Sequence, residues 1–137
     1  MNDPMTPANA PELVVTRVDS PDEEAAFVTL SSGAAEVVAF CHPCELVVGS
    51  RIPNRLWPLD VDVLQAAYLD DWPEEERAAP SVERLEHHGH ARYSGVGQVI
   101  DAAHGRVLVR GFVIEFGEAL ADVRHVEFDV TRLDCAV

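Results

Sequence analysis

The sequence contains no lysine, and its ten basic residues are all arginine. Isoleucine and asparagine are also scarce. These three residue types use A/T-rich codons, so their scarcity predicts a GC-rich bacterial genome rather than selection for arginine chemistry. Against the ten arginines stand 24 aspartates and glutamates, which give the 137-residue chain a formal net charge of −14 at pH 7.

This shortage of positive charge excludes whole classes of partner. Nucleic-acid-binding proteins neutralise phosphates with clustered lysine and arginine, which this chain lacks. A chain with a net charge of −14 would repel nucleic acids and anionic membrane surfaces alike. We therefore expect no nucleic-acid and no membrane partner, and a basic protein is the natural complement.

Several other features are missing. No run approaches the ~20 apolar residues that a membrane helix needs. Residues 1–11 are polar and lack a basic region followed by an apolar one, so we expect a flexible tail rather than a secretory signal, and a cytoplasmic location. Three cysteines are too few for a disulfide scaffold. There is no Walker loop, no G-x-S-x-G elbow and no H-E-x-x-H motif, so the sequence predicts no catalytic residues.

Short β-rich runs bounded by turn residues occupy both halves of the chain. Two of them, 26–30 and 37–42, are separated by a short connection containing Ser31, Ser32 and Gly33, which predicts a β-hairpin. The turn-like residues 101–105 predict a second hairpin between the runs on either side. The runs are 13–18, 26–30, 37–42, 98–100, 106–116 and 126–130.

The alternation of apolar residues changes phase within 106–116. Val107 and Val109 share one face of an extended chain, whereas the later apolar residues have the opposite parity. Period-two geometry therefore requires a bulge or bend near Gly111. Residues 126–130 alternate without interruption, as expected for a strand with one face in water. The predicted core residues are Phe112, Ile114, Phe116, Val126, Phe128 and Val130.

The middle of the chain, 59–80, is acidic and irregular. The apolar residues of 61–69 have helical spacing and Asp60 is an acceptable N-cap, which predicts one short helix. Val61 and Val63 also alternate as they would in a strand, so the conformation of this segment stays open.

Together these elements predict a mostly β fold with an irregular acidic insertion and one short helix. A small antiparallel barrel, closed or partly open, removes the unpaired edges of such a set of strands. The order of a meander, an insertion, a hairpin and a last strand resembles that of an oligonucleotide/oligosaccharide-binding (OB) barrel, in strand order alone. A β-sandwich is the alternative. We expect a single domain over 12–137, preceded by the tail at 1–11.

The acidic middle is the candidate partner-binding region. Acidic residues at this density repel one another, so solubility alone explains them poorly, whereas such a patch would steer a basic partner. Tryptophans at its margins are typical anchors of protein interfaces. We therefore expect a non-catalytic protein-binding module, such as an inhibitor or immunity-type protein that masks a basic partner. Its binding residues would be Trp57, Asp60, Asp62, Asp70, Asp71, Trp72, Glu74, Glu75 and Glu76.

The tetrapeptide at 41–44, Cys-His-Pro-Cys, suggests a second class of function. It is similar to the motif of thiol–disulfide oxidoreductases, but those enzymes place the motif at a helix N-terminus in a βαβ unit. The alternative function is a small metal- or ligand-binding protein in which Cys41 and Cys44 bind zinc together with two imidazoles, those of His88 and His90. If both cysteines instead pack as small apolar residues, no cofactor is expected.

Overall fold

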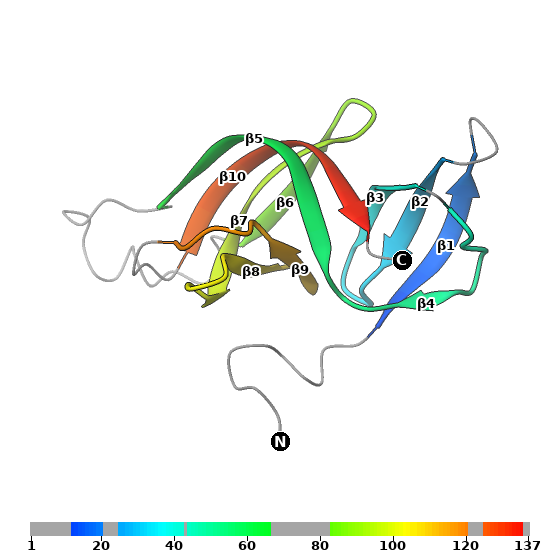
Figure 1. Cartoon of the computed structure of the whole chain (residues 1–137), viewed down its shortest axis with the longest axis horizontal. Helices are drawn as coiled ribbons and strands as arrows, with labels where there is room; N and C mark the ends of the chain where they lie inside the picture. The colour runs from blue at the N-terminus through cyan, green and yellow to red at the C-terminus, as the bar shows by residue number, and fades with distance from the viewer. Residues whose placement is uncertain (1–11, 21–24, 43, 67–82, 121–124, 136–137) are drawn as a thin grey trace, which may run out of the picture.

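The computed structural model describes residues 12–20, 25–42, 44–66, 83–120 and 125–135, and these residues form ten β-strands and no helix (Figure 1). The strands are β1 (Leu13–Asp19), β2 (Ala26–Ser31), β3 (Glu36–Cys41), β4 (Arg51–Ile52), β5 (Leu56–Ala66), β6 (Arg84–His88), β7 (Arg92–Asp101), β8 (Arg106–Val109), β9 (Phe112–Glu115) and β10 (His125–Cys135). The predicted mostly β fold is confirmed. The tail predicted at 1–11 lies outside the described residues. Within the described chain, no helix could span a membrane.

Five of these strands form a closed barrel. They pair in the order β5, β10, β7, β8 and β9, and β9 returns to β5 through one parallel contact between Ile114 and Leu56. The other contacts in the ring are antiparallel, and β6 adds to β7 outside it. A closed ring gives most of its strands a partner on both sides. The predicted small barrel, rather than the sandwich, is therefore the architecture.

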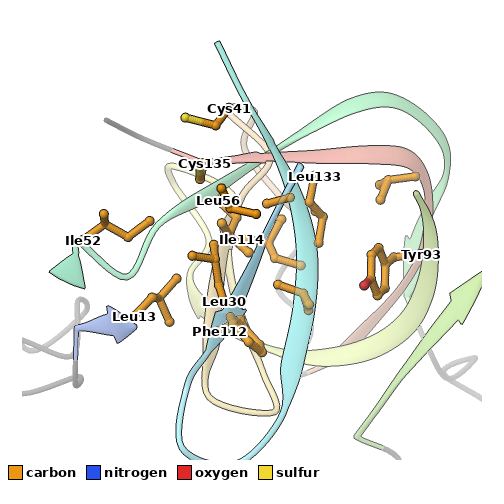
Figure 2. Close-up of a cluster of buried hydrophobic side chains, with 14 of the residues drawn as sticks. Leu13, Leu30, Cys41, Ile52, Leu56, Tyr93, Phe112, Ile114, Leu133 and Cys135 are labelled. Atoms are coloured by element: carbon orange, nitrogen blue, oxygen red, sulfur yellow. The ribbon is translucent and has the colours of Figure 1, made fainter. Parts of the chain in front are cut away.

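The N-terminal strands form a sheet that extends from the barrel instead of entering the ring. Its order is β4-β1-β2-β3, and it joins the barrel where β3 runs parallel to the end of β10, at Phe40 and Asp134. The hairpin predicted from 26–30 and 37–42 is β2–β3. Alternate residues of β2 and β3 are buried, and they share one core cluster with residues of β5, β9 and β10 (Figure 2).

Strand β5 replaces the short helix predicted over 61–69. It pairs with β10 along its whole length. The alternation of Val61 and Val63 was therefore the correct signal, because cross-strand pairing outweighs a weak helical spacing. Asp60 is not a helix N-cap. It has a left-handed backbone, with φ of 53°, next to a shift in the β5–β10 register. Residues 67–69 lie outside the described residues.

A hairpin turn, not a bulge or bend within one strand, changes the phase of the apolar residues near Gly111. Strand β8 ends at Val109, β9 begins at Phe112, and these two residues pair with each other. Between them Arg110 and Gly111 have φ of 50° and 86°. Two consecutive positive φ values are what a two-residue type I′ turn requires. The predicted strand 106–116 is therefore two antiparallel strands.

The predicted core is largely confirmed. Phe112, Ile114, Val126, Phe128 and Val130 are buried, whereas Phe116 is only partly buried, with its ring centroid 5.7 Å from that of Phe128. Strand β9 is buried on both sides, because Val113 on its opposite face is covered as well. Phe112 and Ile114 belong to one core cluster with residues of both the barrel and the β1–β4 sheet, so β9 links the two parts of the core.

Asn54 connects the corner before β5 to strand β9. Its side-chain amide donates to the Gly111 carbonyl oxygen at 2.7 Å, and its Oδ1 accepts from the Val113 N–H at 3.0 Å. On this side β9 has a strand neighbour only at Ile114. Asn54 therefore satisfies backbone groups that the β-ladder leaves open.

Two further hydrogen bonds hold the β1–β4 sheet on the barrel. The Tyr93 hydroxyl of β7 accepts from the Val38 N–H of β3 at 2.8 Å. Ser32, in the turn between β2 and β3, donates from Oγ to the Arg110 carbonyl oxygen at 2.8 Å. Both bonds are partly buried, and they fix the orientation of the β1–β4 sheet relative to the ring. The orientation of the sheet in turn sets the position of its outer face.

Candidate functional site

A row of side chains crosses the outer face of five adjoining strands. Asp19 of β1 pairs with Phe27 of β2, which pairs with Phe40 of β3. Phe40 neighbours Asp134 of β10, which pairs with Trp57 of β5. Residues that pair directly share one face of a sheet, so these side chains line a single face. This face runs from the β1–β4 sheet onto the adjoining ends of β10 and β5.

Arg132 holds the central part of this row together. Its guanidinium carbon lies 3.9 Å from the centroid of the Phe40 ring, and the guanidinium donates two hydrogen bonds to the Asp134 carboxylate, at 2.7 and 3.1 Å. The Phe27 ring stands edge-on to Phe40, with their centroids 5.4 Å apart. Leu59 pairs with Arg132 and adds an apolar side chain beside Trp57. We call Phe27, Phe40, Trp57, Leu59 and Arg132 the aromatic strip.

Two histidines border the aromatic strip. The ring of His90, in the turn between β6 and β7, stands edge-on to Phe27 at a centroid distance of 4.5 Å. The His42 ring is parallel to Phe40 at 6.3 Å. Aromatic rings gathered around an arginine are typical of the residues that dominate protein–protein interfaces.

Trp57, one of the predicted partner-binding residues, is 37% exposed. It is followed at alternate positions of β5 by Leu59 and Val61, which are 38% and 40% exposed. Single exposed apolar residues are ordinary on a protein surface, but three in succession on one strand are not scattered. At this end, the aromatic strip therefore continues into apolar side chains that are exposed to solvent.

Two of the predicted acidic residues, Asp60 and Asp62, alternate with these apolar side chains on β5. Asp60 is exposed. Asp62 shares Arg92 with Asp129, at 2.9 and 2.8 Å from the guanidinium. The hydrogen bond to Asp129, reinforced by Asp62, raises the pKa of Arg92. The remaining predicted binding residues, which lie outside the described chain, are Asp70, Asp71, Trp72, Glu74, Glu75 and Glu76.

The candidate zinc ligands come from separate elements. Cys41 ends β3 with its side chain in the core, and Cys44 packs against the same core. His88 lies on β6, where its Nε2 is 2.6 Å from the Ser94 hydroxyl, and His90 contacts the aromatic strip. In the part of the chain that the structure describes, no group of three or more histidine, cysteine or acidic side chains is arranged to hold a metal ion.

The third cysteine lies beside the first. Strands β3 and β10 end one residue beyond the neighbouring pair Phe40 and Asp134, which places Cys41 next to Cys135 (Figure 2). Cys44 packs against the core cluster that contains both of them. Burial raises the pKa of both Cys41 and Cys135, so these two thiols are protonated at neutral pH.

A depression of about 260 Å³ on the barrel wall is open to solvent and has polar side chains in its lining. Gln65 donates across it to Glu127, which already satisfies both groups. Gly95 lies at its base, where a Cβ would be 2.3 Å from the Arg84 carbonyl oxygen, so glycine lets β6 approach β7. Small-molecule sites are typically enclosed and largely apolar, and this depression is neither.

An ion-pair network closes the turn between β7 and β8. The Asp101 carboxylate accepts from His104 through its Nδ1 at 2.8 Å and its backbone N–H at 3.2 Å. Arg106 lies 3.6 Å from Asp101 and 3.0 Å from Glu115. Burial opposes ionisation of Asp101, but the hydrogen bonds from His104 and the charge of Arg106 lower its pKa. Because every partner lies within β7–β9 and their turns, the network serves the hairpins.

Comparison with family models, with curated proteins and with solved structures finds no match to this chain. What the aromatic strip can bind is therefore inferred from its own residues alone. The sequence reasoning found Trp57 but missed Phe27, Phe40 and Arg132. A signal was present, because Phe27 has the opposite parity to the apolar residues around it and so marks a large ring on the wet face of β2.

Proposed function

We propose that this chain is a non-catalytic binding module that attaches to a basic protein and masks it, as an inhibitor or immunity-type protein does. The observation that carries the proposal is the aromatic strip, which spans two parts of one continuous outer face on a chain with a net charge of −14.

The aromatic strip suits a protein partner better than a small ligand. Its rings lie along a sheet face rather than in an enclosed cavity, and Arg132 already covers the Phe40 ring. The exposed ends, Trp57 and Leu59, offer apolar area that a flat protein surface could cover. Desolvated tryptophan and arginine typically supply most of the binding energy in such contacts.

Electrostatics favour a basic partner over a second copy of this chain. Two copies would each bring a net charge of −14 to the contact, and like charges oppose their approach. Asp19 lies at one end of the row, and at the other end Asp60 follows Trp57 by three residues on β5. The sequence adds further acidic residues at 70–76. A positively charged surface would be attracted over long range and then held by the apolar contacts.

The first test concerns Trp57. Trp57→Ala should raise the dissociation rate of a partner recovered by pull-down about tenfold or more, as loss of an interface hot spot does, with little change in the association rate. Surface plasmon resonance measures both rates. Val48→Ala is the control, because Val48 is an exposed apolar residue in the loop before β4, outside the strip. Equal, small effects of both changes would overturn the assignment of the interface.

The second test concerns charge. Replacing Asp70, Asp71, Glu74 and Glu75 together by their amides should slow association severalfold at low salt, because steering weakens. Thermal stability should stay unchanged or rise slightly, since repulsion within the chain falls. Association rates at two ionic strengths provide the measurement. A partner whose association ignores both salt and the four neutralisations would show that the acidic charge does not select it.

A further inference from the structure

The thiols of this chain, three residues from two distant parts of the sequence, meet at the junction of the barrel and the β1–β4 sheet. Cys41 is fully buried and Cys135 is 8% exposed, and both belong to the core cluster (Figure 2). Cys44 packs against the same cluster but is only partly buried. Cys41 lies next to Cys135 in the β3–β10 register, and Cys44 follows Cys41 by three residues. Cys44 is thus the most exposed residue of the group and the first that a reagent in solvent would meet.

We propose that Cys44 is an oxidation site for a peroxide, and that Cys41 resolves the oxidised form into a Cys41–Cys44 disulfide. The proposal is independent of the proposed function, because it concerns the inner side of the junction rather than the aromatic strip.

The chemistry proceeds in two balanced steps. The Cys44 sulfur attacks one oxygen of hydrogen peroxide, the O–O bond breaks, and the Cys44 proton leaves with the released oxygen as water. Cys44 is then a sulfenic acid. The Cys41 sulfur attacks the Cys44 sulfur, the S–O bond breaks, and the hydroxyl leaves as a second water with the Cys41 proton. Two thiols are oxidised by two electrons, and one peroxide is reduced to two waters.

The placement of the thiols decides which pair forms. A peroxide in solvent reacts first with sulfur that it can reach, before it reaches sulfur buried in an apolar core. Cys135 is nearly as buried as Cys41, so a Cys41–Cys135 disulfide would have to start at a sulfur that solvent does not reach. Cys41 is the last residue of β3, and the described residues after it, His42 and Cys44, lie in no strand. A disulfide between Cys41 and Cys44 therefore leaves the β3–β10 contact at Phe40 and Asp134 in place.

Hydrogen peroxide is the probe. The purified full-length chain, reduced beforehand, is treated with hydrogen peroxide, alkylated, digested without reductant and analysed by mass spectrometry. Titration of free thiols should fall from three per chain to one, and a Cys41–Cys44 linked species should appear. Cys135→Ser should give the same disulfide. Cys44→Ser should lose its thiols more slowly by about tenfold or more, because the two that remain are buried.

Cys41→Ala should leave a sulfenic acid at Cys44 that dimedone traps. Circular dichroism checks that each variant is folded, and if Cys41→Ala is not, Cys44→Ser and Cys135→Ser decide the question alone. A Cys41–Cys135 disulfide, or oxidation of Cys44→Ser at the rate of the parent, would overturn the proposal. So would equimolar zinc that survives dialysis and is lost in Cys44→Ser, because the thiols would then be metal ligands.

Discussion

The closed ring and the β1–β4 sheet cover their apolar residues in different ways. The ring encloses side chains within itself, and Phe112 and Ile114 of β9 share one core cluster with buried residues of the sheet. The sheet has one dry face, laid on the ring, and one wet face. The aromatic strip begins on the wet face of the sheet, at Phe27 and Phe40, and continues onto the ends of β10 and β5.

Three kinds of interaction join the two regions: a strand contact, side-chain hydrogen bonds and a shared apolar core. One parallel strand contact links β3 to β10. Tyr93, Ser32 and Asn54 supply hydrogen bonds between elements that are distant in sequence. The apolar core cluster is continuous across the boundary. Stability is therefore expected to depend on the inner face and on these joints much more than on the outer face.

The largest expected effect separates the inner face from the outer one. Phe128→Ala should lower the free energy of unfolding by roughly 3–5 kcal/mol, because it leaves a cavity in a packed core. Phe27→Ala, on the wet face of β2, should cost about 1 kcal/mol, because Phe27 is only partly buried. Urea denaturation of both variants measures the difference. Equal losses would mean that the aromatic strip is part of the core.

An intermediate effect is expected at the joint made by Asn54. Asn54→Ala leaves the Val113 N–H and the Gly111 carbonyl without their partner, and it should cost about 1–3 kcal/mol. Asn54→Asp keeps the acceptor for Val113 but not the donor to Gly111, so it should lie between the parent and the alanine variant. Chemical denaturation gives all three values. No loss in Asn54→Ala would show that water satisfies both groups.

The smallest effect concerns the ion-pair network of the β7–β8 turn and depends on pH. The pKa of Asp101 is lowered in the folded chain, so its carboxylate stabilises the fold above the unfolded pKa, and this contribution is lost as pH falls through the folded pKa. The stability difference between the parent and Asp101→Asn should thus be present at pH 7, begin to fall near about pH 4, and vanish only below the folded pKa. Thermal melts across pH measure it. Asp19→Asn, in an exposed ion pair with Arg17, should show almost no difference at any pH.

The sequence predicted strands best where one face is wet. The alternation over 126–130 and the short connection after 26–30 were sufficient, because a half-buried strand leaves its period in the residue order. Alternation was misleading at Arg110. This residue has a positive φ, although arginine is not one of the residues that usually occupy such a turn position. The hairpin turn was therefore predicted as a bulge or bend within one strand. The local sequence was also insufficient over 61–66, where pairing with β10 decided between two local patterns.

For the candidate site, the sequence singled out Trp57, Asp60 and Asp62, which lie on β5, and it gave the net charge of −14. It could not show that Phe27, Phe40 and Trp57 share one face, because that depends on the order in which strands from three regions of the chain pair.

The sequence alone determined that this chain is mostly β and strongly acidic, because composition and period-two alternation are local properties. The tertiary structure alone decided that β1–β4 stay outside the ring, that Arg132 lies over Phe40, and that Cys135 lies beside Cys41. Each of these depends on the register between β10 and strands far away in the sequence. Such a register is set by the packing of the whole core, and no single segment encodes it.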